Sequence, residues 1–350
     1  MFNRILLPLD GSLLAERAIP HAMQFARIFG SNIILLRVLN PISYQENPAA
    51  VDPLKWQIRK TEADLYMQSI TDRLCKELES ETPIKIIPKN DEFDKCKPRV
   101  EYFIHEGNPA ENIINFAHTE NIDLLVISTH GSSGLSRWNT GSVAQKVFSL
   151  IYLPILVVRA FSQPEVEDIR VAYRRILLPI DSSRRAEYSL SAGIALARGE
   201  PNKKINIGDT ANQTKLILAA VIKPPEIPIP EPYPVEIEKL SDQLMAVCRY
   251  SVSNYLSDMK SRLPVNCESL IVENASVSSA IQELADQDGA IDLVVLCAHG
   301  YTGRSAWPYG TVTRNYLEHG TKTVLVIQDL SCSNVQPSAA EMAFEKSRGL

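Results

Sequence analysis

The sequence repeats itself once, at a nearly constant spacing of about 170 residues. The segment RILLPLD at residues 4–10 returns as RILLPID at residues 175–181. The segment DLLVISTHG at residues 123–131 returns as DLVVLCAHG at residues 292–300, and shorter matches follow in the same order. Because the spacing is that of a domain and not of a solenoid repeat, the chain is predicted to contain one α/β domain twice.

Short apolar runs in the first copy predict the strands of a parallel sheet. They lack polar alternation, so both faces of the sheet should be covered by helices. Strands that alternate with helices predict a doubly wound fold with right-handed crossovers. The predicted fold class is α/β: two tandem doubly wound domains, each a mostly parallel five-stranded sheet flanked by helices. The apolar runs are residues 5–9, 33–39, 124–127 and 155–158.

Helical patterns separate these runs. Ser12 fits the N-cap of the first helix and Gly30 its end. Pro20 fits that helix only near a first turn, because proline lacks a backbone N–H. Pro109 suits the first position of a later helix. The patterns cover residues 15–29, 55–79, 108–119 and 143–150.

The second copy departs from the first in two segments, a polar insertion at residues 199–213 and a proline-dense surface loop at residues 224–234. A polar segment between the copies predicts a linker, and the last residues predict a tail. The predicted organisation is domain one at 1–160, linker at 161–172, domain two at 173–330 and tail at 331–350.

Composition narrows the function classes. A net charge of -5 without a dense Lys/Arg run argues against a nucleic-acid binder. The six cysteines show no paired or metal-ligand spacing, which is typical of reduced thiols. No apolar stretch approaches the roughly 20 residues of a membrane span, and the first residues lack the features of a signal peptide. We therefore expect a cytoplasmic protein that binds neither nucleic acid nor membrane.

Glycines follow the strand at residues 124–127 and lead into the next helix. In an open parallel sheet, ligands bind outside the carboxyl ends of the strands. Gly131, Gly134 and Gly141 let the backbone approach a ligand, and a helix that starts at Ser142 or Val143 offers N–H groups and a positive dipole end. The pattern predicts a polyphosphate cradle; the alternative is that the glycines serve only turns. The same spacing recurs in the second copy at Gly300, Gly310 and Thr311.

Both halves resemble domains of the universal stress protein family, whose fold is that of the adenine-nucleotide α-hydrolases. The family's ATP-binding pattern is Gly-x-x-Gly, nine residues, then Gly-Ser/Thr. Both copies keep the spacing and the last elements, whereas Ser128 and Cys297 replace the first glycine. The resemblance implies ATP as ligand, with Mg²⁺, and at most slow hydrolysis. It implies no catalytic residue and no metal-ligating side chain.

The resemblance also assigns site residues. It places Asp10 and Asp181 at the adenine end, with backbone groups of Val38 and Val221 facing the base. The full set is Pro8, Asp10, Val38, Ser128, Gly131, Gly134, Gly141, Ser142 and Val143 in copy one, and Asp181, Val221, Cys297, Gly300, Gly310 and Thr311 in copy two.

Other side chains near the motif have simpler interpretations. His130 and His299 fit hydrogen-bonding struts better than general bases. Trp138 and Trp307 fit a hydrophobic cover over the loop better than a stacking platform. Cys297 is expected to be a small semi-buried residue and not a redox-sensitive thiol.

Three function classes follow. The first is an ATP-binding regulatory protein of the stress response, since the chain lacks the Gly-x-x-x-x-Gly-Lys-Ser/Thr loop of rapid phosphoryl transfer. The second is a nucleotide-independent interaction scaffold, because both copies have lost the leading glycine. The third, weaker, is a true ATPase or kinase.

The copies are not expected to be equivalent. Pro308 stiffens the second loop just before Gly310, so we expect ATP in copy one and a weaker or mainly structural site in copy two. The resemblance implies that the copies pair through their last strands as a pseudo-dimer within the chain. A homodimer and an unidentified protein partner are further expectations.

Overall fold

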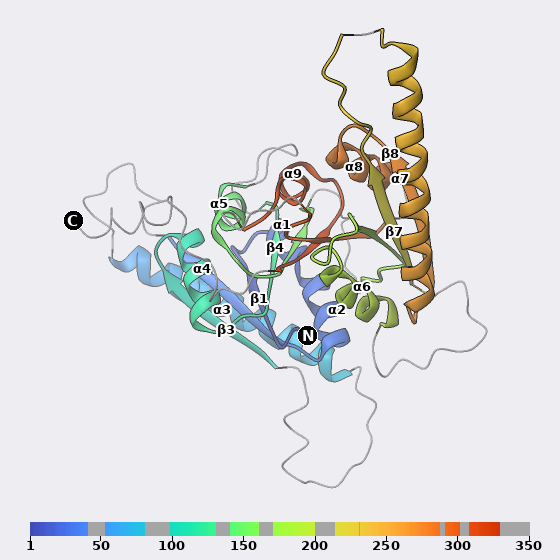
Figure 1. Ribbon diagram of the computed structural model, residues 1–350. Helices are drawn as coiled ribbons and strands as arrows, with labels where there is room; N and C mark the ends of the chain where they lie inside the picture. Colours follow the sequence, from blue (N-terminus) through green and yellow to red (C-terminus); the bar gives the residue numbers. More distant parts are fainter. Residues whose placement is uncertain are drawn as a thin grey trace. The chain divides into compact units, whose positions relative to one another are not determined.

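A computed structural model gives the fold of the 350-residue chain. The chain divides into two compact units, Met1–Ala172 and Tyr173–Leu350, and each is described here by itself (Figure 1). The predicted tail, and nearly all of the predicted linker and polar insertion, lie outside the described residues. The structure describes residues 1–40, 53–80, 99–130, 141–160, 171–199, 214–230, 232–287, 291–301 and 308–329.

The sheet of unit one has the order β3-β2-β1-β4-β5, and its strand pairs are parallel. The chain begins with β1 in the middle of the sheet and adds β2 and β3 on one side. It then continues with β4 and β5 on the other side of β1, so the strand order reverses between β1 and β4. The central residues of its inner strands are apolar and buried because helices cover both faces. The strands are β1 (Arg4–Pro8), β2 (Asn32–Leu39), β3 (Val100–Glu106), β4 (Leu124–Ser128) and β5 (Ile155–Val158).

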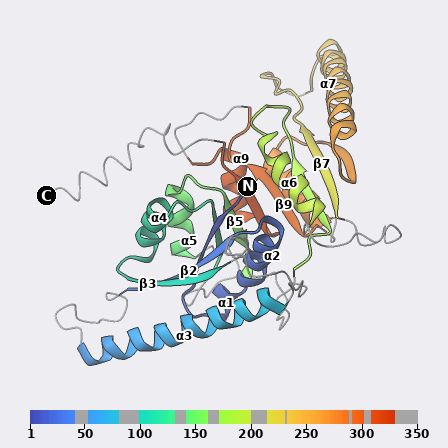
Figure 2. The same ribbon diagram turned by 90° about the horizontal axis from the view of Figure 1, so that it is seen from below.

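Strand β3 is the one that the apolar runs did not reveal. It lies at the edge of the sheet and alternates between its two faces. The Tyr102 hydroxyl donates to Asp64 of α3 (Pro53–Ser80) at 2.9 Å, whereas the Phe103 ring contacts Phe116 of α4 (Pro109–Thr119). Neighbouring residues of a strand point to opposite faces, so α3 and α4 lie on opposite faces of this sheet (Figure 2).

The first helical pattern forms two helices, so the prediction of one helix over residues 15–29 was wrong. Helix α1 (Leu13–Glu16) is capped by Ser12, whose Oγ accepts the Ala15 N–H. Helix α2 (Ile19–Phe29) then starts afresh with Pro20 in its first turn, where the missing N–H costs no helical hydrogen bond. It ends at Gly30, whose φ of 68° is left-handed. Helix α5 (Ser142–Leu150) follows β4.

Unit two repeats this plan with the sheet order β10-β9-β6-β7-β8. Its strand pairs are also parallel. The strands are β6 (Arg175–Pro179), β7 (Lys215–Ile222), β8 (Cys267–Glu273), β9 (Leu293–Cys297) and β10 (Val324–Ile327), and the helices are α6 (Tyr188–Arg198), α7 (Val235–Arg262), α8 (Val277–Gln287) and α9 (Thr311–His319).

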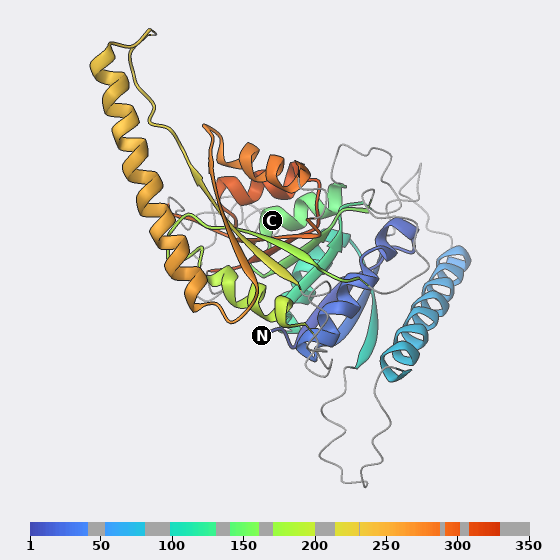
Figure 3. The same ribbon diagram turned by 90° about the vertical axis from the view of Figure 1, so that its right-hand side faces the viewer.

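The proline-dense segment joins β7 to α7, and its described residues are irregular and mostly exposed, as predicted. Helix α7 packs on β7 and β8 with its C-terminal half, and its N-terminal half projects past the strands (Figure 3). Leu240, Leu244 and Val247 on that projecting half are 62%, 49% and 62% exposed.

Some side-chain contacts recur between corresponding elements of the two units. The Tyr66 hydroxyl donates to Glu16, and the Tyr255 hydroxyl donates to Glu187, each at 2.9 Å. Asp123 accepts the backbone N–H groups of Asn3 and Arg4, as Asp292 accepts those of Arg174 and Arg175. The duplication therefore extends to interactions between distant segments, and not only to the strands.

None of the helices in the described part of the chain combines the length and hydropathy needed to cross a membrane.

Candidate functional site

The predicted site residues gather at the carboxyl ends of the strands where each sheet reverses its order. In unit one, Asp10 follows β1 and Ser128 ends β4. In unit two, Asp181 follows β6 and Cys297 ends β9. Gly131 and Gly134 lie outside the described residues.

The turn after β1 is organised by an aspartate. Asp10 Oδ1 accepts the backbone N–H of Ser12 at 3.0 Å and its hydroxyl at 2.6 Å. Between them Gly11 has a φ of +79°, a left-handed conformation that favours glycine. In unit two Asp181 accepts the Ser183 N–H at 3.0 Å, and Ser182 adopts the left-handed conformation with φ 63°. Pro8, also a predicted site residue, is the last residue of β1.

A glycine caps the helix that follows the motif in each unit. The Gly141 N–H donates to the Thr129 carbonyl at 2.8 Å, and a Cβ on Gly141 would lie 3.1 Å from that oxygen. The Gly310 N–H donates to the Ala298 carbonyl at 2.8 Å, and a Cβ on Gly310 would lie 3.4 Å from that oxygen. Gly141 thus allows the chain to pass close to the strand end, whereas a Cβ on Gly310 would be in ordinary contact there. Because the first N–H groups of a helix have no intrahelical acceptor, α5 and α9 present theirs at this edge.

Val38 and Val221 occupy matching positions one residue before the ends of β2 and β7. The residue before Val38 is Arg37, whereas the one before Val221 is Ala220. The Arg37 guanidinium carbon lies 6.0 Å from the centre of the Tyr66 ring, and Nη1 donates to the Leu9 carbonyl at 3.4 Å. Unit one therefore has a cation beside the turn after β1.

Tyr66 is held in this cluster by more than one group. Its hydroxyl donates to Glu16, which also pairs with Arg73 at 3.4 Å. Burial, and then the nearby Glu16 carboxylate, raise the pKa of Tyr66 above its ordinary value, so the phenol stays neutral. The sequence analysis missed Arg37 and Tyr66; the signal was an arginine inside an otherwise apolar strand.

His130 is buried and hydrogen-bonded to its neighbour. Its Nδ1 lies 2.9 Å from the Thr129 hydroxyl oxygen, which also accepts the Ala160 N–H at 3.4 Å. The His130 N–H in turn donates to the Ser128 hydroxyl at 3.4 Å. These contacts match the role of a strut.

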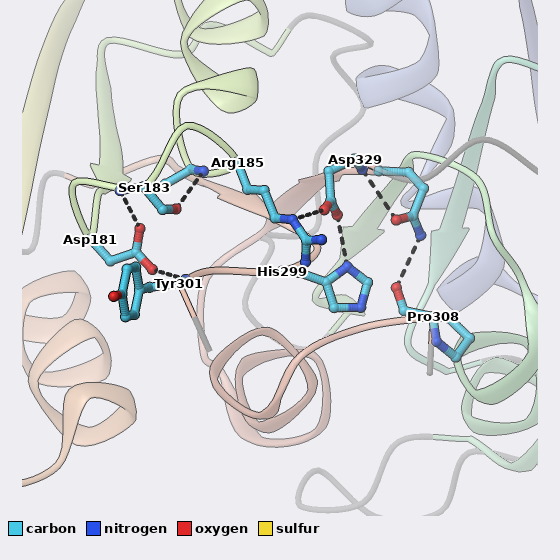
Figure 4. A network of polar contacts seen from close by, with 9 residues as sticks. Asp181, Ser183, Arg185, His299, Tyr301, Pro308 and Asp329 are labelled. Carbon is cyan, nitrogen blue, oxygen red and sulfur yellow. Dashed lines mark hydrogen bonds and ion pairs between the residues drawn. The ribbon is translucent and has the colours of Figure 1, made fainter. Parts of the chain in front are cut away.

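His299 has different partners. Its Nδ1 lies 2.7 Å from Asp329 Oδ1, and Asp329 Oδ2 lies 3.5 Å from Arg185 Nε (Figure 4). The side chains of His299 and Asp329 are each 1% exposed. The sequence analysis missed Arg185 and Asp329; the available signal was that copy one has apolar residues, Leu14 and Ala160, at these positions.

Cys297 is buried at the end of β9, 7% exposed. Burial, assisted by the Asp329 and Asp181 carboxylates, raises the pKa of the Cys297 thiol to about 12, against a smaller lowering by backbone N–H groups. The thiol is therefore protonated at neutral pH, as expected of a small buried residue. The Thr313 hydroxyl of α9 donates to the Cys297 carbonyl at 2.7 Å and fixes the helix to the strand end.

Within the described ranges, His, Cys, Asp and Glu side chains form no group of three or more that could hold a metal ion.

Comparison with known proteins settles the family. The universal stress protein family model matches residues 1–159 and 172–328, which is most of the chain in two tandem segments. The chain belongs to the universal stress protein family. Among curated relatives, universal stress protein MJ0531 of Methanocaldococcus jannaschii is 30% identical over 159 residues, covering 45% of this chain and 83% of the relative. Universal stress protein YxiE of Bacillus subtilis is 28% identical over 160 residues, covering 45% of this chain and all of the relative.

Solved structures agree on the fold of this universal stress protein. One from Archaeoglobus fulgidus matches with a TM-score of 0.55 at 14% identity, over 93% of this chain and 96% of the other. A putative universal stress protein from Pseudomonas aeruginosa matches with a TM-score of 0.59 at 14% identity, over 93% of each chain. The resemblance drawn from the motifs is thereby confirmed, as is the predicted fold class.

Proposed function

We propose that this universal stress protein binds ATP in its first copy and acts in the stress response through nucleotide-dependent conformation or partner binding. It hydrolyses ATP slowly at most. The second copy is the weaker or structural one.

The observation that carries this proposal is the glycine-capped start of α5. Gly141 lies so close to the Thr129 carbonyl that a side chain would be crowded there. The N–H groups of Ser142, Val143 and Ala144 come first in the helix, and the positive end of its dipole faces the strand ends. Such a helix start suits a phosphate chain. Gly131 and Gly134 are assigned to the same phosphates on motif spacing alone.

The base and ribose are assigned to the neighbouring strand ends. Asp10 and Pro8 would meet the adenosine from β1, the Val38 backbone would face the base, and Ser128 would lie at the ribose. Arg37, beside Gly11, adds a positive charge at this end. Mg²⁺ would arrive on the phosphate oxygens of ATP and keep several waters, so it needs no cage of protein ligands.

A scaffold that works without nucleotide is the second candidate. It is favoured by the loss of the leading glycine in both copies and by the exposed apolar residues Leu240, Leu244 and Val247 on α7.

Equilibrium binding of labelled ATP to the purified full chain, with Mg²⁺, tests the proposal. We expect saturable binding that falls at least tenfold in Gly141→Val, because the side chain would displace the Thr129 carbonyl or the helix start. Ser149→Ala, an exposed change near the other end of α5, is the matched control and should bind as the parent does. Far-ultraviolet circular dichroism verifies that the variants are folded. Absence of binding at millimolar ATP would contradict the proposal and favour the scaffold.

Turnover provides a separate measurement. Linear steady-state hydrolysis faster than roughly one per second would instead indicate an enzyme.

A further inference from the structure

A buried ionic network lies behind the motif of the second copy. The Asp329 carboxylate contacts the imidazole of His299 on one side and the Arg185 guanidinium on the other (Figure 4). Asp329 and His299 are almost completely removed from water, each 1% exposed. A buried carboxylate is unfavourable unless paired, so Asp329 depends on His299 and on Arg185, whose side chain is 40% exposed, to compensate its charge.

Further hydrogen bonds hold the chain at Tyr301 and at Pro308, on the two sides of residues 302–307. Before that segment, the Tyr301 N–H donates to Asp181 Oδ2 at 2.6 Å. After it, the Pro308 carbonyl accepts from the Gln328 side chain at 3.0 Å, and the Asp329 N–H donates to Gln328 at 3.2 Å. Residues that follow β6 and β10 therefore hold the described residues at the two ends of this part of the motif.

The first copy provides the comparison within the same chain. Arg185 stands four residues after Asp181, where the first copy has Leu14 four residues after Asp10. Asp329 stands two residues after the end of β10, where the first copy has Ala160 after β5.

The contacts of the two copies differ accordingly. In the first copy the histidine of the motif meets the Thr129 hydroxyl, and the Ala160 carbonyl accepts from Arg17. In the second copy a full carboxylate stands at the position of Ala160. A phosphate chain needs cations and N–H donors, and a carboxylate beside it repels it.

We propose that Asp329 is the residue that excludes polyphosphate from the second copy. It acts by holding Arg185 and His299 in an internal network and by placing a carboxylate behind His299, whose Cα would lie 3.6 Å from a Cβ on Gly310 at the start of α9. The proposal rests on the proposed function, in which the first copy binds ATP. It adds that each chain takes one nucleotide and that one side chain sets this number.

Titration calorimetry of the full chain with ATP and Mg²⁺ measures the number of sites. We expect one nucleotide per chain for the parent protein and two for Asp329→Ala, which installs the residue of the first copy and removes the carboxylate that pairs with Arg185. Asp329→Asn keeps the shape of the side chain and removes its charge, so this variant should also bind a second nucleotide. If Asp329→Ala fails to fold, the number of sites in Asp329→Asn tests the proposal. Glu283→Gln, which removes an exposed carboxylate of α8, should leave the number at one.

The reverse experiment transplants the network. Leu14→Arg combined with Ala160→Asp should weaken binding in the first copy at least tenfold. Two equivalent sites in the parent protein, or one site in both Asp329 variants, would overturn the proposal. If the parent protein binds no ATP, the proposed function is contradicted. In that case an Asp329 variant that gains a site still supports the role of Asp329. An Asp329 variant that gains no site overturns that role.

Discussion

The carboxylate of Asp181 lies directly against the Cα of Gly300. A Cβ on Gly300 would overlap Asp181 Oδ2, the oxygen that accepts the Tyr301 N–H. A side chain at this position would displace the Asp181 carboxylate, and the constraint is one of space, since Gly300 has no left-handed φ.

Replacing Gly300 by alanine should therefore push Asp181 away from its backbone donors. We expect Gly300→Ala to lower the free energy of unfolding by about 1–3 kcal/mol, as for other crowded positions. Gly310→Ala is the control, because its Cβ would stand 3.4 Å from the Ala298 carbonyl in ordinary contact. Urea unfolding of the two variants compares them, and equal loss of stability would contradict the crowding at Gly300.

His21 should make the stability of the protein depend on pH. Burial in α2 lowers the pKa of His21 from 6.5 to about 4, so the folded state keeps the neutral ring while the unfolded chain takes up a proton at higher pH. The contribution is complete above pH 6.5 and is lost as the pH falls toward 4, by about 3 kcal/mol. Denaturation at several pH values should show it. In His21→Leu this part of the pH dependence should disappear, and an unchanged slope would exclude His21 as its source.

Two glutamates should differ in what they contribute to stability. Glu77 of α3 lies 3.1 Å from Arg27 of α2, with side chains only 20% and 7% exposed. Glu101 of β3 lies 3.9 Å from Arg4, with side chains 46% and 32% exposed. Glu77→Ala should cost about 3 kcal/mol, because it leaves a buried guanidinium without this carboxylate. Glu101→Ala should cost less than about 1 kcal/mol. Thermal unfolding measures both, and a reversed order would refute the ranking.

Cys297 should resist thiol reagents in the folded protein. With a pKa near 12, about 10⁻⁴ of the thiol is ionised at pH 8, and the side chain is buried. Half-buried Cys248 should be alkylated before Cys297. Mass spectrometry of timed iodoacetamide labelling reads the order, and in urea both thiols should react at similar rates. Early labelling of Cys297 would revive its interpretation as a redox-sensitive thiol.

Much of the fold follows from local sequence. Strands β1, β2, β4 and β5 are continuous apolar runs, and Ser12 and Gly30 fit a helix start and a helix end by their own chemistry. Strand β3 could not be recognised in the same way, because an edge strand with two differently covered faces has no continuous run. Pro20 indicated that a helix must begin close to it, and α2 does begin one residue earlier, but the separate short helix α1 was not predicted.

The site was only partly accessible to sequence. Motif spacing led to Ser128, Gly141 and their repeats, which the structure brings to the strand ends, while their contacts with a ligand stay predictions. The network of Arg185, His299 and Asp329 joins three segments far apart in the chain, so no local pattern contains it. Comparing the copies position by position would have flagged it, since Leu14 and Ala160 are apolar.

Translation of both copies as one polypeptide fixes their ratio at one to one in every molecule. Every molecule that carries Asp329 in its second copy therefore also carries a first copy without this carboxylate. Two separate genes for the two domains would not guarantee that combination. Because the two halves are inherited together, the second can change while each molecule still carries the motif surroundings of the first.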